Sequence, residues 1–128
     1  MEDLPDDAVV VRGGLFPNAE DVLDLILDAL DDGDGPVLSV FAADPAAHGS
    51  VNSAISAACR GGQVPHRKVR VTQAGALRRL GFKLVQDSSD GQAECHYHVV
   101  FSGDPTIVEV QAFVDCFGDP IFNPAKGE

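Results

Sequence analysis

The chain contains 128 residues, has a mass of 13.4 kDa and carries a formal net charge of −11. This length predicts a single domain over residues 1–128, because domains usually contain about 100–150 residues. Hydrophobic residues make up 45% of the chain, which excludes a wholly disordered protein. No apolar run approaches the roughly 20 residues that span a bilayer, and no secretory signal pattern is visible, so we expect a cytoplasmic protein without a membrane segment.

The first half of the chain alternates short β-branched runs with amphipathic segments. Residues 8–11 predict a buried strand that stops at a glycine pair. Asn18 is suited to cap a helix whose apolar stripe ends near Leu30. Further along we expect a strand over 37–41, a loop over 42–49 and a helix over 50–59.

The second half is expected to contain three more strands and two more helices. Lys68 to Val71 alternate as in a strand, Thr72 is expected to cap a short helix, and Asp104 with Pro105 predicts the start of the last helix. The other predicted elements are a helix over 73–80, strands over 82–85 and 94–101, and flexible tails over 1–7 and 119–128. The short elements favour an α+β fold, with a mixed, mostly antiparallel sheet of about five strands and three to four helices.

The charges are distributed in three blocks. Residues 45–86 contain seven basic side chains and no acidic one, and acidic residues dominate on either side. Two interpretations stay open: the basic block pairs with the protein's own acidic helix, or it binds an anion. The net charge disfavours long nucleic acid, so a small anionic ligand or an acidic protein partner fits better.

The cysteines indicate neither a disulfide framework nor a metal site. Cys59, Cys95 and Cys116 form an odd, widely spaced set without a Cys-x-x-Cys pair. Such a set is a poor disulfide framework and does not predict a thiolate zinc site. We expect reduced cysteines, as in a cytosolic protein.

Basic side chains supply the candidate ligand-binding residues. Arg12 precedes two glycines at the end of a strand, a place suited to a phosphate or a carboxylate, although the glycines are also ordinary turn residues. His66, Lys68 and Arg70 are read either as an anion site or as a solvated edge strand. Arg78 and Arg79 complete the candidate ligand-binding set.

Imidazoles supply the candidate catalytic residues. Glu94, His96 and His98 share one face of the predicted last strand, and this face could hold a divalent metal or an acid–base pair. A His-x-His pair most often only lines the polar face of a sheet. Of the two chemical interpretations we choose acid–base use, so we assign His96 and His98 as catalytic and name no metal ligand. Ser39, in a predicted strand, is a third catalytic candidate.

Several segments carry a resemblance to known families. Residues 9–14, 38–41, 65–66, 69–82 and 96–98 resemble a small bacterial family common in actinobacteria. The run from Ala74 to Arg79 before a His-containing strand is also similar to small effector toxins with an ADP-ribosyltransferase-like fold. This resemblance implies an NAD cleft beside Arg12 and Ser39. Transferases of that fold use a late catalytic Glu, and neither Glu94 nor Glu109 stands in the expected motif.

Two functions from different classes follow from these observations. The first is a small toxin-like enzyme that binds a dinucleotide or an RNA phosphate in a basic cleft, either ADP-ribosyltransferase-like or a metal-independent ribonuclease. The second is a non-catalytic acidic protein of the antitoxin, immunity-protein or phage-inhibitor type, with an acidic helix face that meets a basic partner. That face consists of Glu20, Asp24, Asp28 and Asp31. The first hypothesis requires the late imidazoles and the basic side chains to converge on one cleft.

Overall fold

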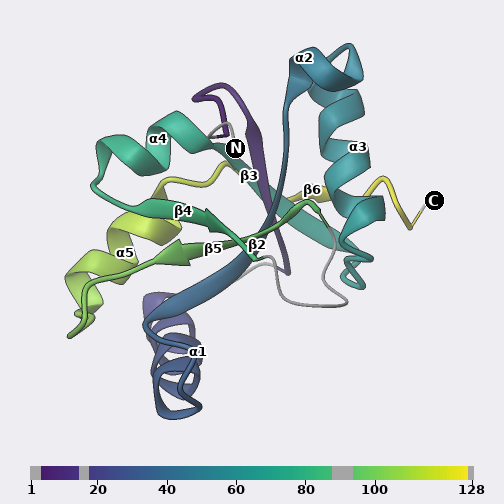
Figure 1. The fold of residues 1–128 in the computed structure, drawn as a ribbon. Helices are drawn as coiled ribbons and strands as arrows, with labels where there is room; N and C mark the ends of the chain where they lie inside the picture. Colours follow the sequence, from purple (N-terminus) through teal and green to yellow (C-terminus); the bar gives the residue numbers. More distant parts are fainter. Residues whose placement is uncertain (1–3, 15–17, 88–93, 127–128) are drawn as a thin grey trace.

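A computed structural model describes residues 4–14, 18–87 and 94–126, and these form one antiparallel sheet with helices on both faces (Figure 1). The strands are β1 (Val9–Gly13), β2 (Val37–Ala43), β3 (Lys68–Gln73), β4 (Lys83–Gln86), β5 (His96–Val100) and β6 (Ile121–Phe122). The helices are α1 (Ala19–Asp31), α2 (Pro45–His48), α3 (Val51–Gly61), α4 (Ala74–Arg79) and α5 (Ile107–Asp115). The strand order is β4-β5-β2-β1-β3-β6. The α+β class is confirmed.

Two apolar layers form because the side chains of a strand alternate between the two faces of a sheet. Val10, Val40 and Val99 belong to the larger layer, which includes side chains of α1, α4 and α5. Val9 and Val11 belong to the smaller layer, beneath α3. The central strand β1 is therefore buried on both faces, which explains its unbroken run of valines.

Short polar side chains begin most of the helices. Asn18 accepts from the backbone N–H of Asp21 at 2.9 Å, as its place in the sequence predicts. The prediction that Asp104 caps the last helix is wrong, because the cap is Thr106. Thr72 is not a cap either. It lies in β3 beside Val10, and its hydroxyl oxygen lies 2.9 Å from the carbonyl oxygen of Cys116, to which it donates.

Within the tail expected over 119–128, the structure places a short strand at residues 121–122. Ile121 and Phe122 pair with the start of β3 and add the sixth strand. The side-chain amide of Asn123 is buried and donates to the carbonyl oxygens of Val64 and His66, at 2.9 and 2.8 Å. These bonds satisfy a buried polar group and hold the segment before β3 in place.

A smaller difference concerns the loop expected over 42–49. β2 continues to Ala43, and Asp44 caps the short helix α2 by accepting from the N–H of Ala46.

Among the described helices, none combines the length and the apolar composition that a bilayer crossing requires.

Candidate functional site

A cluster of polar side chains lies on the face of the sheet that carries α3, beyond the strands that α3 covers. Tyr97 and Val99 pack with the larger apolar layer, so His96 and His98 point to the opposite face, as the alternation predicts. Asp87 follows β4 directly, and its backbone N–H donates to the carbonyl oxygen of His96 at 2.9 Å. The antiparallel pairing of β4 with β5 therefore brings one carboxylate beside two imidazoles.

The distances within this cluster approach those of a metal site. Oδ2 of Asp87 lies 3.1 Å from Nδ1 of His96 and 3.6 Å from Nε2 of His98. The ligand atoms of all three residues lie within 4.8 Å of one another. Two ligands of a tetrahedral zinc ion, with bonds of about 2.0–2.1 Å, are roughly 3.4 Å apart. Small side-chain adjustments would bring the three atoms onto one ion.

The surroundings of His96 favour the neutral imidazole. Burial lowers the pKa of His96; the Asp87 carboxylate opposes this effect, and His98 adds to it. The ring stacks on Phe41, with centroids 5.3 Å apart, and meets the ring of His98 nearly at right angles. A neutral imidazole held in a fixed orientation is the form that binds metal ions.

Glu94 aligns with the two histidines in the sequence, but the structure brings Asp87 to them instead. Glu94 is exposed and precedes β5, and its carbonyl oxygen accepts from the side-chain amide of Gln86. One signal in the sequence could have identified Asp87. The Asp90-Gly91 dipeptide is typical of hairpin turns, and a chain folded back near it pairs position 87 with position 96. These two turn residues lie outside the described residues.

Ser39 and His66 lie on the same face as the cluster. Ser39 pairs with His98 across β2 and β5. The ring of His66 covers Gly13, where a Cβ would collide with it. Continuing the β1–β2 register by two residues places Gly13 beside Ser39. His66, Ser39 and His98 therefore form a row across strands spaced about 4.8 Å apart.

Arg12 and Arg70 are separated from this row because they point to the other face. They pair with each other across β1 and β3, next to Val10 and Thr72. Arg12 donates to the carbonyl oxygen of Ser39 at 2.7 Å, and burial lowers its pKa. Arg70 donates to the carbonyl oxygens at 114, 117 and 118, at and beyond the carboxyl end of α5. The structure does not bring these guanidinium groups to the imidazoles.

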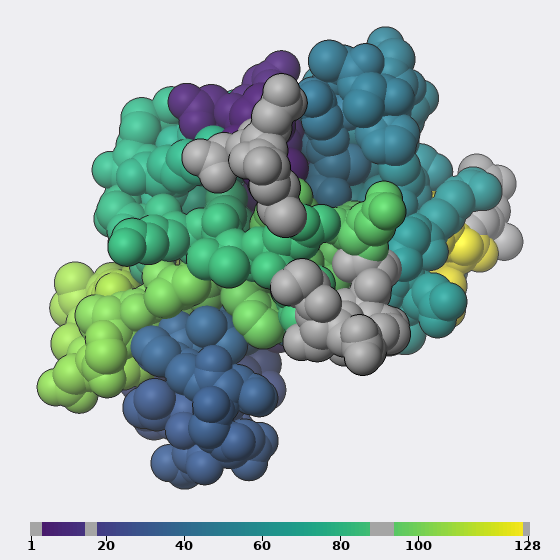
Figure 2. All heavy atoms as spheres, viewed as in Figure 1, coloured from purple at the N-terminus to yellow at the C-terminus, as the bar shows by residue number. Residues whose placement is uncertain are grey.

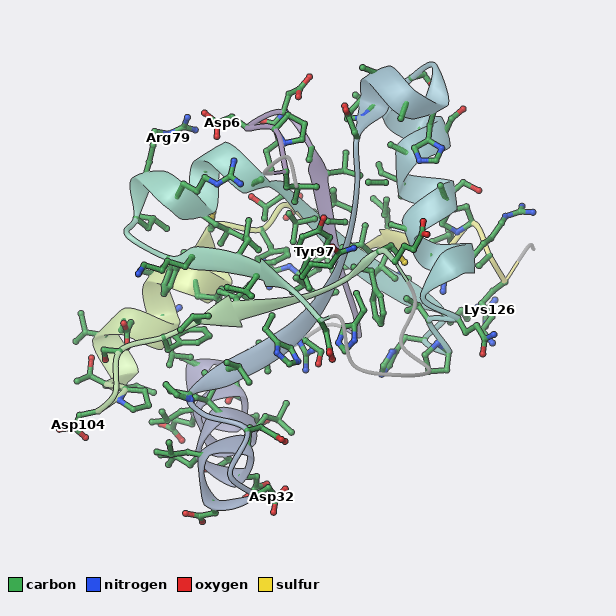
Figure 3. The ribbon with its side chains drawn as sticks, in the orientation of Figure 1. Asp6, Asp32, Arg79, Tyr97, Asp104 and Lys126 are labelled. Carbon is green, nitrogen blue, oxygen red and sulfur yellow. The ribbon has the colours of Figure 1, made fainter. Side chains whose placement is uncertain are left out.

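The remaining basic candidates lie apart from both groups. Arg78 forms an ion pair with Asp6 at 2.7 Å, and Arg79 is exposed on α4. Figure 3 places Arg79 at the opposite end of the molecule from Asp32, which follows α1. Among the described residues, no carboxylate of α1 forms an ion pair. The acidic helix therefore does not neutralise the basic block within the part of the chain that the structure describes.

Comparison of the chain with protein-family models, curated proteins and solved structures gives no match. The resemblance to ADP-ribosyltransferase-like toxins, and the NAD cleft that it implies, therefore stay predictions. The functional argument rests on the geometry of the side chains.

Proposed function

We propose that the protein binds one divalent transition-metal ion through Asp87, His96 and His98, and that the ion serves hydrolytic chemistry. The observation that carries this proposal is the convergence of three ligand atoms, from two adjacent strand ends, within 4.8 Å. Arg12 and Arg70 donate to backbone carbonyls elsewhere, which supports a site at the imidazoles over one in a basic cleft.

The ligand set supports the class of metal. Two imidazoles with one carboxylate suit zinc and its first-row neighbours, whereas magnesium and calcium prefer oxygen ligands. Three protein ligands leave a coordination position for water, which is the arrangement of catalytic sites. The side chain of His98 is 27% exposed, so solvent and a substrate reach the cluster from that side.

The location of Ser39 supports a catalytic role for the coordination position that the three metal ligands leave open. Its pairing with His98 puts the two Cβ atoms about 4.5–5.5 Å apart on the same face. A bound zinc ion lowers the pKa of its water to about 7. The hydroxyl of Ser39 is placed to orient that water or a substrate oxygen, and His66 stands further along the same row.

Metal titration tests the proposal. Metal-free protein is titrated with Zn²⁺ by calorimetry and with Co²⁺ by visible absorption, and we expect one ion per chain. The variants Asp87→Asn and His98→Ala should lose binding, whereas His48→Ala, which removes an exposed imidazole on α2, should not. Hydrolysis of a phosphodiester test substrate should then require the metal. If no metal binds, or if metal binding survives both variants, the proposal is wrong. The three residues would then form only a hydrogen-bonded Asp–His cluster.

A second function, a docking helix for a basic protein, is favoured by the shape and charge of α1. Figure 2 shows α1 as a lobe that protrudes from the body of the molecule. Its carboxylates are exposed, and Leu25 and Leu30 are exposed between them. A surface of this kind fits a basic, partly apolar partner of the type that an antitoxin or immunity protein binds.

This alternative predicts salt-dependent binding of a basic amphipathic peptide. Neutralising Asp24, Asp28 and Asp31 as Asn should abolish the binding. The same change at Asp7, Asp104 and Asp119, which are also exposed, should have little effect. Equal loss in both triple variants would reduce the interaction to net charge alone.

A further inference from the structure

A cavity lies at the opposite edge of the sheet from β4, and none of its lining residues is a proposed metal ligand. It has a volume of about 540 Å³ and is lined by Gly14, His66, Arg67, Lys68 and Phe122. Its walls come from the start of β3, the end of β1 and the edge strand β6. This volume lies within the range of roughly 300–1,000 Å³ that small-molecule sites occupy.

An exposed aromatic ring forms one wall of this cavity. Phe122 is 63% exposed and pairs with Lys68 in the sheet. Nζ of Lys68 lies 5.3 Å from the centroid of the ring, and Cζ of Arg67 lies 5.9 Å from it. Both cations stand over the ring in cation–π contact, so a planar group that stacks on the exposed part of the ring has two positive charges beside it.

The two cations at this cavity differ from three arginines elsewhere in the chain. Arg12, Arg70 and Arg78 each donate to a carbonyl oxygen or a carboxylate. Arg67 and Lys68, by contrast, form no ion pair with any described residue, although the chain carries a net charge of −11. Their positive charge is therefore left for an anion from solution.

We propose that this cavity binds a nucleoside monophosphate, with the base stacked on Phe122 and the phosphate held by Arg67 and Lys68. Stacking on an aromatic ring accepts any base, and a nearby guanidinium and ammonium group bind phosphate oxygens. His66 adds a donor at the rim. The acidic remainder of the chain repels long polyanions, so the charge pattern favours a small ligand over a nucleic-acid strand.

One lining residue of the cavity also belongs to the row of side chains that leads to the proposed metal site. The ring of His66 lines the cavity and also covers Gly13, next to the row that leads to Ser39 and His98. A nucleotide held at Phe122 would extend toward the imidazole face of the sheet. The binding proposal itself does not depend on the metal, because neither Asp87 nor its two histidines lines the cavity.

Calorimetry in the presence of a chelator tests the inference independently of the metal. The ligands are AMP, adenosine and inorganic phosphate, titrated into the full chain. We expect AMP to bind about tenfold more tightly than either fragment, because stacking and charge act together. Affinity for AMP should fall as salt rises, and UMP should bind in the same range because the stacking surface does not select a base.

Matched variants separate the cavity from general charge and hydrophobicity. Phe122→Ala and Lys68→Ala should each weaken AMP binding by about tenfold. Val108→Ala removes a side chain that is 76% exposed on α5, and Lys83→Ala removes a cation from β4; neither should matter. No binding at millimolar AMP would overturn the proposal. Phosphate binding as tight as AMP, or AMP affinity unchanged in Phe122→Ala, would also overturn it.

Discussion

The strands β3 and β5 carry the same kind of sequence pattern but use it differently. In each strand, polar side chains at alternate positions share one face: Lys68, Arg70 and Thr72 on β3, and His96 and His98 on β5. On β5 the two imidazoles meet a carboxylate from the neighbouring strand end. On β3 the guanidinium of Arg70 binds carbonyl oxygens at the end of α5. Alternation therefore predicts which face a side chain takes, but the neighbouring element decides whether it builds a site or holds the fold together.

The largest effect on stability should come from removing Arg70. Arg70→Ala leaves carbonyl oxygens without their charged donor at the end of α5, and should lower the free energy of unfolding by about 3 kcal/mol. Urea denaturation measures this loss. Lys68→Ala, on the same strand and face, is the matched control and should change stability by less than about 0.5 kcal/mol. Similar losses in both variants would contradict the division of roles along β3.

Metal binding should stabilise the fold by a comparable amount. Zinc present at a hundredfold excess over its dissociation constant should raise the free energy of unfolding by about 2.7 kcal/mol, because only the folded chain assembles the cluster. The measurement is a thermal or urea unfolding curve with and without zinc. Asp87→Asn should remove most of this gain, and a gain that persists in that variant would place the metal elsewhere.

Cys59, in the smaller apolar layer, should make the stability of the fold fall at alkaline pH. Burial, assisted by Cys95, raises the pKa of the Cys59 thiol from 9.0 to about 11. The unfolded chain ionises this thiol first, so its contribution is complete below pH 9 and is lost as the pH rises to 11. The loss should be on the order of 2 kcal/mol. Unfolding curves of the protein and of Cys59→Ala measure it, and parallel pH profiles would refute it.

The smallest effect is expected for the ion pair between Arg78 and Asp6. The Asp6 side chain is 77% exposed, so solvent screens the pair although the atoms are 2.7 Å apart. Asp6→Asn should therefore cost about 0.5 kcal/mol or less, and the cost should vanish in high salt. A large, salt-independent loss would contradict the view that solvent screens this ion pair.

Local patterns in the sequence predict the elements better than they predict their partners. Alternation alone predicts that Val99 and His98 lie on opposite faces of β5. Thr72 is expected to cap a helix, but its pairing with Val10 of β1 makes it a strand residue, so this prediction is wrong. The burial of Asn123 is not predicted locally, because the two carbonyl oxygens to which its side-chain amide donates lie more than fifty residues away.

The candidate site shows the same limit. His96 and His98 are recognisable from their spacing, but Asp87 joins them only through the register of a hairpin. The charge pattern predicts a basic region, yet the position of Phe122 beside Lys68 depends on a strand of two residues. Such short pairings are weakly encoded because they lack the length for a periodic pattern.

The brevity of β6 has a consequence for how the chain tolerates shortening. Only Lys68 and Val69 of β3 are covered by it, and it is anchored by the buried amide of Asn123. A chain that ends before Ile121 would lose both the cover and the anchor. The outer rim of the sheet would then present unpaired N–H and C=O groups next to a valine-rich strand, which is a template for joining two molecules edge to edge. The segment 121–123 thus helps to keep neighbouring copies apart.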